Sequence, residues 1–374
     1  MTSTGTHDDS SKTPNTGGEG GGEAGGGGGG SAAQSPPTAT SGIAVPPELR
    51  HQALARLLGG GSTVPDTTIQ SFLDQAPDLG IDLALLAAAV RGDGPSAQVR
   101  QVCLPVVGAG RTVMLFVSGG VGGGPPEASA ERAAAIREGV RLATEAYGER
   151  AHLAQALAQP RERWAAASFE AAGLERLTIL SYLARTLQPR DAEGSLAPGN
   201  PVKAPEKAAW PGAITVHAMD GSASDEARLR QALDASYEDT MDCPELAGLR
   251  TIEDIVAAHR DVGEFDPALW WIIERDSTPL GCLLLNRCPA QTCVELVYIG
   301  VAPALRGLGL GRLLLRRAIT AASPHGRELR CAVDERNTPA RHMYTALGFR
   351  ETERRVAYVA LVQDMLGKQG KSRA

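Results

Sequence analysis

The sequence lacks a surplus of basic residues and lacks any apolar run of membrane-spanning length. Its 37 lysines and arginines face 43 aspartates and glutamates, which gives a formal net charge of −6 and no strongly basic patch. Nucleic acid is therefore not an expected partner. No segment predicts a transmembrane helix and no apolar signal sequence follows Met1, so we expect no membrane partner and a cytoplasmic protein.

Cysteine is also scarce and scattered. The closest pair is Cys288 and Cys293, and no second pair or histidine cluster completes a zinc-binding pattern. We therefore predict no metal site. The six cysteines are expected to be small buried groups in a reducing compartment.

The length and composition predict two globular segments rather than one. Residues 17–30 read GGEGGGEAGGGGGG and have no apolar surface to offset the entropy of ordering, which predicts a disordered tail. A stretch rich in Pro, Gly, Ala and charge predicts an interdomain linker. The expected organisation is a Gly-rich tail at 1–42, a first domain at 43–187, a linker at 188–212, a second domain at 213–366 and a basic tail at 367–374.

The second segment has a legible order of elements. A strand-like run at 213–219 precedes two helical stretches, at 224–237 with a Ser224 cap and at 251–260 with a Thr cap. Three strand-like runs, LWWIIER, PLGCLLLNR and TCVELVYIGV, come next. A helix (RLLLRRAITAA), a strand (ELRCAVD), a helix (TPARHMYTALG) and a last strand (RRVAYVALV) complete the order β-α-α-β-β-β-α-β-α-β. This order indicates an α/β fold with a mixed, mostly antiparallel sheet.

The first segment follows the same order, with two helical stretches, three strands and a long helix at 128–148. At a constant offset of 175 residues, 137–187 aligns with 312–362 without a gap. Identities there are few, so the matching order of elements carries the inference of an internal duplication.

The stretch RGLGLGR, at 306–312, stands between a strand and a helix. Glycines allow successive N–H groups to curve around an anion at the helix N-terminus, and Arg306 and Arg312 add positive charge. This predicts a pyrophosphate-binding loop, the alternative being an ordinary glycine-rich turn. A dinucleotide fingerprint fails because Arg312 and Leu314 occupy its third glycine position, and a P-loop would need a lysine.

Two adjoining motifs resemble the GCN5-related N-acetyltransferase (GNAT) family. They are VELVYIGVAPALRGLGLGRLLL, with Arg306, Gly309 and Gly311, and VDERNTPARHMYTALGF, with Asn337 and Tyr344. The resemblance covers about 213–363 well and the first segment in outline, so the chain is similar to tandem members of the family. It implies acetyl-CoA as cosubstrate. The implied cofactor-binding residues are Ile299, Val301, Arg306, Gly307, Leu308, Gly309, Leu310, Gly311, Arg312, Asn337 and Tyr344.

The resemblance also implies two catalytic residues. Glu295 would accept the proton of an ammonium substrate, and Tyr344 would donate a proton to the departing thiolate. Strand alternation predicts that Glu295 shares a face with Val297, Ile299 and Val301. The alternatives are a solvent-facing or arginine-paired Glu295 and a core Tyr344. An acidic cluster formed by Glu238, Asp239, Asp242 and Glu245 is either a rim that attracts a cationic amine or a solvated loop.

The first segment looks like a degenerate copy. The 175-residue offset replaces Arg306, Gly309 and Gly311 by Glu131, Ala134 and Ile136, and replaces Asn337 and Tyr344 by Glu162 and Phe169. We expect an N-acetyltransferase that moves an acetyl group directly from acetyl-CoA to a primary amine, on a small molecule or on a protein or peptide. The alternative is a non-catalytic protein that binds and senses acyl-CoA.

Overall fold

The computed structural model describes residues 41–59, 62–92, 94, 97–119, 126–192 and 213–367. The expected glycine-rich tail, linker and basic tail therefore lie outside the described residues, except at their inner ends. Among the described residues, no helix is long and apolar enough to cross a membrane.

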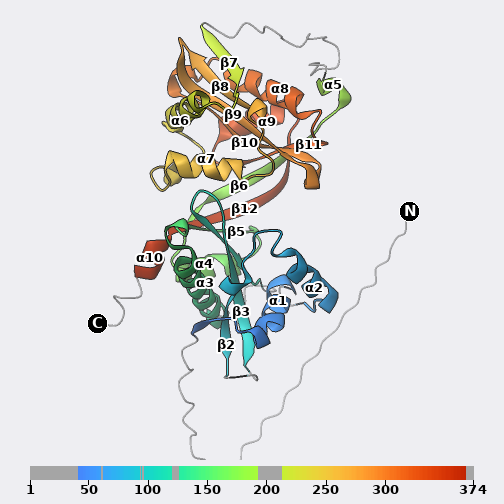
Figure 1. Ribbon diagram of the computed structural model, residues 1–374, viewed down its shortest axis with the longest axis vertical. Coiled ribbons are helices and arrows are strands. Elements are labelled where there is room, and N and C mark those ends of the chain that lie inside the picture. Colours follow the sequence, from blue (N-terminus) through green and yellow to red (C-terminus); the bar gives the residue numbers. More distant parts are fainter. Residues whose placement is uncertain are drawn as a thin grey trace, which may run out of the picture. The chain divides into compact units, whose positions relative to one another are not determined.

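The two halves contain the same succession of elements (Figure 1). The first half comprises β1 (Gly42–Ala44), α1 (Arg50–Gly59), α2 (Asp66–Gln75), β2 (Ala87–Arg91), β3 (Gln98–Val107), β4 (Thr112–Val117), α3 (Pro126–Tyr147), β5 (Leu153–Ala158), α4 (Trp164–Ala172), β6 (Glu175–Thr186) and the short α5 (Pro189–Ala192). The second half comprises β7 (Ile214–Ala218), α6 (Ala223–Tyr237), α7 (Ile252–Arg260), β8 (Trp270–Arg275), β9 (Thr278–Cys288), β10 (Cys293–Val301), α8 (Leu310–Ala322), β11 (Glu328–Asp334), α9 (Thr338–Ala346), β12 (Arg350–Leu361) and α10 (Val362–Gly367).

The expected order of elements is confirmed, and local signals explain most element ends. Thr251 caps α7 in a capping box with Asp254, and Asn337 caps α9. The cap of α6 is Ser222 rather than the expected Ser224, since its hydroxyl accepts the N–H of Asp225.

All strands form one mixed sheet in the order β1-β2-β3-β4-β5-β12-β6-β11-β10-β9-β8-β7. Only the pairs β4–β5 and β10–β11 are parallel. The expected mixed, mostly antiparallel α/β sheet with two tandem copies is therefore confirmed.

The last strands of the two halves are exchanged, a feature that the sequence did not reveal. Strand β12 pairs with β5 of the first half, whereas β6 pairs with β11 of the second, and β6 and β12 lie side by side (Figure 1). Each half therefore receives a strand from the other. The domain boundaries along the chain stay a prediction.

The helices divide between the two faces of the sheet. Ile179 of β6 packs against the core under α3 and α4, and Leu183 belongs to the core under α8 and α9. Because these two residues of one strand have the same parity, both cores lie on one face. Helices α1 and α2 cover β2–β3 on the opposite face, and α6 and α7 cover β8–β10 there.

Candidate active site

An opening in the sheet forms where the parallel strands β10 and β11 separate. Their pairing covers only Cys293–Glu295 against Glu328–Arg330, although β10 continues to Val301 and β11 to Asp334. Beyond Glu295, β10 therefore has an edge that does not pair with β11. This opening runs from Glu295 toward the glycine-rich loop, over a β10 length of about 20 Å.

The backbone of β10 offers hydrogen-bonding groups to this opening. The N–H of Ala302 donates to Leu280 O at 2.7 Å. Bonded and non-bonded pairs alternate along the antiparallel β9–β10 ladder, so the N–H and C=O groups of Ile299 and Val301 face away from β9. An amide-containing ligand in the opening could pair with them as an added strand.

A β-bulge corrects one expectation about Glu295. The register of β10 shifts between Leu296 and Tyr298, which inserts Val297 as an extra residue. Val294, Ile299 and Val301 pack with the core under α8, whereas Val297 packs with the core under α6 and α7. Glu295 therefore shares a face with Val297, and the expectation that it shares one with Ile299 and Val301 is wrong.

Three glycines have two different roles in the loop at 306–312. Gly307 and Gly309 have φ values of +77° and +75°, in the left-handed region that glycine tolerates. Gly311 has no such φ, but a Cβ there would lie 2.9 Å from the Met343 sulfur. A side chain at position 311, in the first turn of α8, would therefore displace the flexible Met343 side chain of α9.

The loop is also a cradle of unpaired N–H groups. The Arg306 N–H donates to Pro303 O at 3.1 Å, and the next N–H along the chain to donate to the backbone is that of Leu313, to Gly309 O at 3.4 Å. Within the described residues, the N–H groups of 307–312 donate to no backbone acceptor, and residues 306–309 are exposed. This arrangement at the N-terminus of α8 fits an anionic phosphate group.

The two arginines of the loop differ. The Arg306 side chain donates to backbone carbonyls of Val301 (3.2 Å) and Asp239 (2.9 Å), and also to that of Glu238. It therefore fastens the loop to the chain that follows α6. Arg312 is exposed on the first turn of α8 and is free to meet solvent or an anion.

Glu295 lies beside Arg330 in the last rung of the β10–β11 ladder. Burial raises the pKa of its carboxyl to about 7, although the Arg330 guanidinium acts to lower it. Such a carboxyl exchanges protons near neutral pH, as a general base must.

Tyr344 lies on the opposite side of the sheet from Glu295. It belongs to the core under α8 and α9, is 4% exposed and stacks edge-on against Phe349. Burial raises its pKa well above the ordinary value, and the neighbouring Cys331 thiol acts in the same direction. The phenol therefore stays protonated and can act as a donor. Asn337 caps the same helix by accepting the N–H of Ala340 at 3.2 Å.

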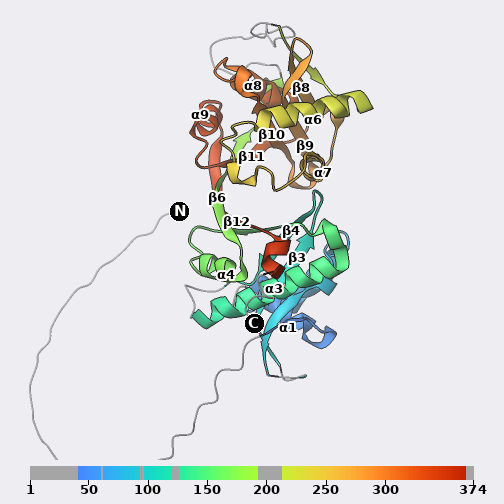
Figure 2. The same cartoon turned by 90° about the vertical axis from the view of Figure 1, so that its left-hand side faces the viewer.

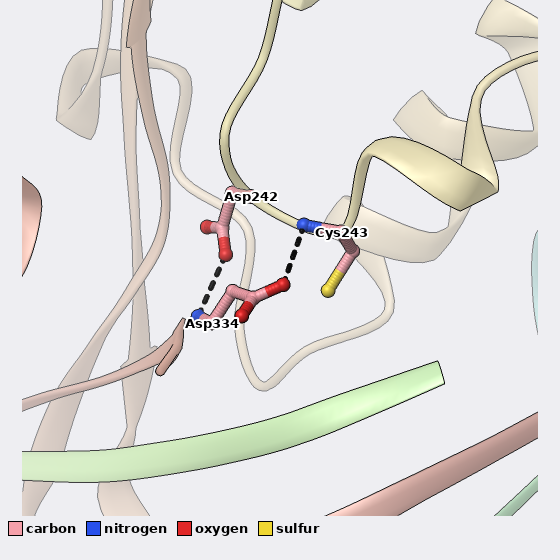
Figure 3. A group of neighbouring side chains, drawn as sticks. All are labelled: Asp242, Cys243 and Asp334. Carbon is pink, nitrogen blue, oxygen red and sulfur yellow. Dashed lines mark hydrogen bonds between the residues drawn. The ribbon is translucent and has the colours of Figure 1, made fainter. Parts of the chain in front are cut away.

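The acidic cluster after α6 divides into paired and exposed members. Asp242 is half-buried and accepts the backbone N–H of Asp334 at 2.7 Å (Figure 3). Glu245 pairs with Arg336. Glu238 and Asp239 are exposed. Asp242, Cys243 and Asp334 have the composition of a metal-binding group. The Asp334 oxygens, however, already accept hydrogen bonds from Thr178, Cys243 and Arg336, so the cluster is self-satisfied.

Sequence reasoning missed Tyr182 and Thr178, which the exchanged strand β6 brings to the Glu295 face. The register pairs Arg330 with Ala184 and Ala332 with Tyr182, which continues the face of Glu295 across two strands. Burial raises the pKa of Tyr182, and Glu295 is among the charges that act on it. The proximity of Tyr182 to Glu295 follows from the pairing of β6 with β11, which the sequence alone does not show.

At the described positions that correspond to Glu295 and Tyr344, the first half has other chemical groups. The β4–β5 ladder pairs Met114 with Gln155 in the rung that corresponds to Glu295 and Arg330. Phe169 of α4 corresponds to Tyr344, as the 175-residue offset predicts. A thioether cannot accept a proton at neutral pH and a phenyl ring cannot donate one.

The 175-residue offset fails upstream of this region, so the alignment of Glu131 with Arg306 is wrong. Helix α3 has 22 residues and α8 has 13, so α3 begins nine residues earlier than the offset predicts. Glu131, Ala134 and Ile136 therefore lie inside α3 and not in a loop, and Glu131 is buried beside Arg100. The chain that corresponds to the loop at 306–312 instead follows Ser118, mostly outside the described residues.

A splayed pair of parallel strands, a glycine-rich anion cradle and a carboxyl that titrates near neutrality are features that a transferase site for a phosphate-bearing cosubstrate would have. Residues 233–349 match the family model described as Acetyltransferase (GNAT) family. The second half of the chain thus contains a domain of the GNAT family of acyltransferases.

Relatives with the same name support this assignment. A mycothiol acetyltransferase of Thermomonospora curvata is 28% identical over 288 residues, which are 73% of this chain and 90% of that protein. A mycothiol acetyltransferase of Beutenbergia cavernae is 30% identical over 187 residues, 48% of this chain and 58% of that protein.

Solved structures of GNAT proteins, one of them a tandem GNAT protein, also resemble the chain. A GCN5-related N-acetyltransferase from Sphaerobacter thermophilus has a TM-score of 0.48 and 16% identity, with 88% of this chain and 97% of that chain covered. A tandem GNAT protein from the clavulanic acid biosynthesis pathway has a TM-score of 0.41 and 16% identity, with 86% and 98% covered.

Proposed function

We propose that the protein transfers an acetyl group from acetyl-CoA directly to a primary amine, at the opening between β10 and β11. The observation that carries the proposal is the arrangement around this opening. The glycine-rich loop lies at one end, Glu295 lies at the other on one face of the sheet, and Tyr344 approaches from the opposite face. The amine would therefore lose its proton to Glu295 on one face of the sheet, and the leaving thiolate would receive a proton from Tyr344 on the opposite face.

The residues of the opening fit acetyl-CoA. The N–H groups of 307–312 and the exposed Arg312 would hold the pyrophosphate, with Arg306 holding the loop in place. The backbone of Ile299 and Val301 would pair with the amides of the pantetheine arm. When bound, acetyl-CoA supplies an activated acyl group.

Proton handling then falls to two side chains. Glu295, with a pKa of about 7, is half ionised at neutral pH and accepts a proton from the incoming ammonium, directly or through water. Tyr344 keeps its proton until a thiolate develops nearby and then donates it.

Direct transfer needs no acyl-enzyme, and the state of the thiol beside Tyr344 supports this. Cys331 is 2% exposed, and burial raises the pKa of its thiol far above the ordinary value. A thiol held protonated is a poor nucleophile.

The acceptor is a primary amine on a small molecule or a peptide, and the acceptor of the mycothiol acetyltransferases is a specific candidate because of the 28% identity. It would lie on the Glu295 face, which both halves line. A cytoplasmic setting stays a prediction, supported by six free cysteines of which four are buried.

Turnover of acetyl-CoA by the purified full chain tests the proposal. The acceptors would be a panel of primary amines, including an amino sugar, a cysteinyl amine and a lysine peptide, with release of free thiol as readout. Amine-dependent thiol release is the expected result. Tight acetyl-CoA binding without turnover on any amine would instead favour the non-catalytic acyl-CoA sensor.

A further inference from the structure

The chain between α6 and α7, residues 238–251, contains two strained positions. Asp239 and Cys243 have φ values of +48° and +49°, in the left-handed region that residues with a side chain rarely adopt. Such conformations persist where surrounding contacts enforce them, and they cluster at functional sites. We call this segment the α6–α7 loop.

A single buried carboxylate enforces the conformation at Cys243. Asp334, 0% exposed at the end of β11, accepts the Cys243 N–H at 3.1 Å on Oδ2. Its own N–H donates to Asp242 Oδ1 at 2.7 Å, so the loop and the strand end are bonded in both directions (Figure 3).

The same carboxylate reaches the other half of the chain. The Thr178 hydroxyl of β6 donates to Asp334 Oδ1 at 2.7 Å, and Thr178 is only 6% exposed. Arg336 donates to Asp334 Oδ2 at 2.7 Å and also bonds Glu245 of the loop. Burial alone would raise the pKa of Asp334, but the bonds from Arg336 and Thr178 outweigh it and lower the pKa.

The location of this contact connects it to the site. Asp334 has the parity of Arg330 on β11 and hence lies on the face of Glu295, four residues further along. Two residues after Arg336 begins α9, which carries Tyr344. Arg306 fastens the beginning of the same loop to the glycine-rich loop.

We propose that Thr178 and Asp334 are positioning residues that hold the α6–α7 loop over the acceptor side of the opening. Through Thr178, the half without catalytic groups then acts on the reaction of the other half. The role in acceptor binding rests on the proposed function, whereas the hold on the loop does not.

The test is Thr178→Val in the full chain, with Thr186→Val as the matched control. Valine keeps the β-branched shape but removes the donor to Asp334, and Thr186 is an exposed threonine at the end of the same strand. Hydrogen exchange, without ligand and with acetyl-CoA alone, is followed in peptides that cover 240–249. We expect faster exchange at the Cys243 amide in Thr178→Val only, and unchanged exchange there would overturn the proposal.

Kinetics separate positioning from a merely structural role. With the most active amine of the panel as probe, KM for the amine should rise about tenfold in Thr178→Val, the effect of one hydrogen bond to a charged group. The acetyl-CoA dissociation constant and kcat should change less than twofold. An equal loss in kcat and in acetyl-CoA affinity would contradict positioning of the acceptor. A wild-type protein that acetylates no amine would refute the proposed function and the acceptor role, and hydrogen exchange would still decide the hold on the loop.

Discussion

The substitution Glu295→Gln isolates the proton-accepting step. Glutamine keeps the shape and hydrogen-bonding capacity of the side chain but cannot accept a proton at neutral pH. We expect turnover to fall by ~10²–10⁴, the usual contribution of a positioned base, with acetyl-CoA affinity nearly unchanged. Tyr344→Phe should lose less activity, because an acid and not a base is removed.

The pH profile sharpens this prediction. With a pKa of about 7, Glu295 should make wild-type kcat/KM fall about tenfold per pH unit below neutrality, as the base becomes protonated. In Glu295→Gln the break near pH 7 should disappear, and the remaining rate should rise with pH across the whole range as free amine accumulates. Thiol release measured from pH 5.5 to 9.5 checks both, with the exposed Glu264→Gln as control. Full activity of Glu295→Gln at pH 7 would refute the assignment and direct attention to Asp242, whose pKa burial also raises.

Four further outcomes follow from the structure. The folded-state pKa of Glu295 is raised from 4.5 to about 7, so its contribution to stability is present below pH 4.5 and lost as pH rises to 7. At pH 8 the free energy of unfolding of Glu295→Gln should therefore exceed that of wild type by at most about 3 kcal/mol, which a higher melting temperature would show. Gly309→Ala should weaken acetyl-CoA binding in calorimetry, whereas Gly221→Ala, with a similar φ of +81°, should lower the melting temperature without changing affinity. Arg330→Gln should move the acid limb of the activity profile to higher pH, because the guanidinium lowers the pKa of Glu295. A chain cut by a protease at a site inserted within 193–212 should elute from a sizing column as one species.

The order of elements could be predicted from sequence because hydrophobic periodicity and capping residues act locally. ELRCAVD is the whole of β11, and QVRQVCLPVV is the whole of β3. Of the expected site, Glu295 and the glycine-rich loop lie at the two ends of one opening, and Tyr344 lies in the core that Ile299 and Val301 join, because two motifs close in sequence lie on adjacent elements. Their roles stay predictions.

Three features were beyond such reasoning. The bulge at Val297 leaves no mark in VELVYIGV, since any residue can occupy it, yet it reverses the face of every later residue of β10. The nine additional residues of α3 continue its helical pattern, so an ungapped comparison of the two halves cannot detect that α3 is longer than α8. Thr178 and Tyr182 lie near Glu295 only because β6 pairs with β11, and the period-2 pattern of a strand does not specify its neighbour.

The strand exchange explains why the cut chain should stay together. With the halves divided after β6, separation would break the β6–β11 ladder of seven register pairs and the β12–β5 ladder of six, and would also part β6 from β12. It would expose Leu183 and Val356, which lie in the two different cores that the exchanged strands complete. It would also remove the Thr178 hydroxyl from Asp334 and so release the loop beside the acceptor. Because apolar burial and ladder bonds are lost on both sides at once, separation resembles unfolding more than dissociation of a domain interface. Two cut halves that separate without denaturant would show that β12 can re-pair with β11 in the absence of β6, and that the half without catalytic groups is dispensable for the fold.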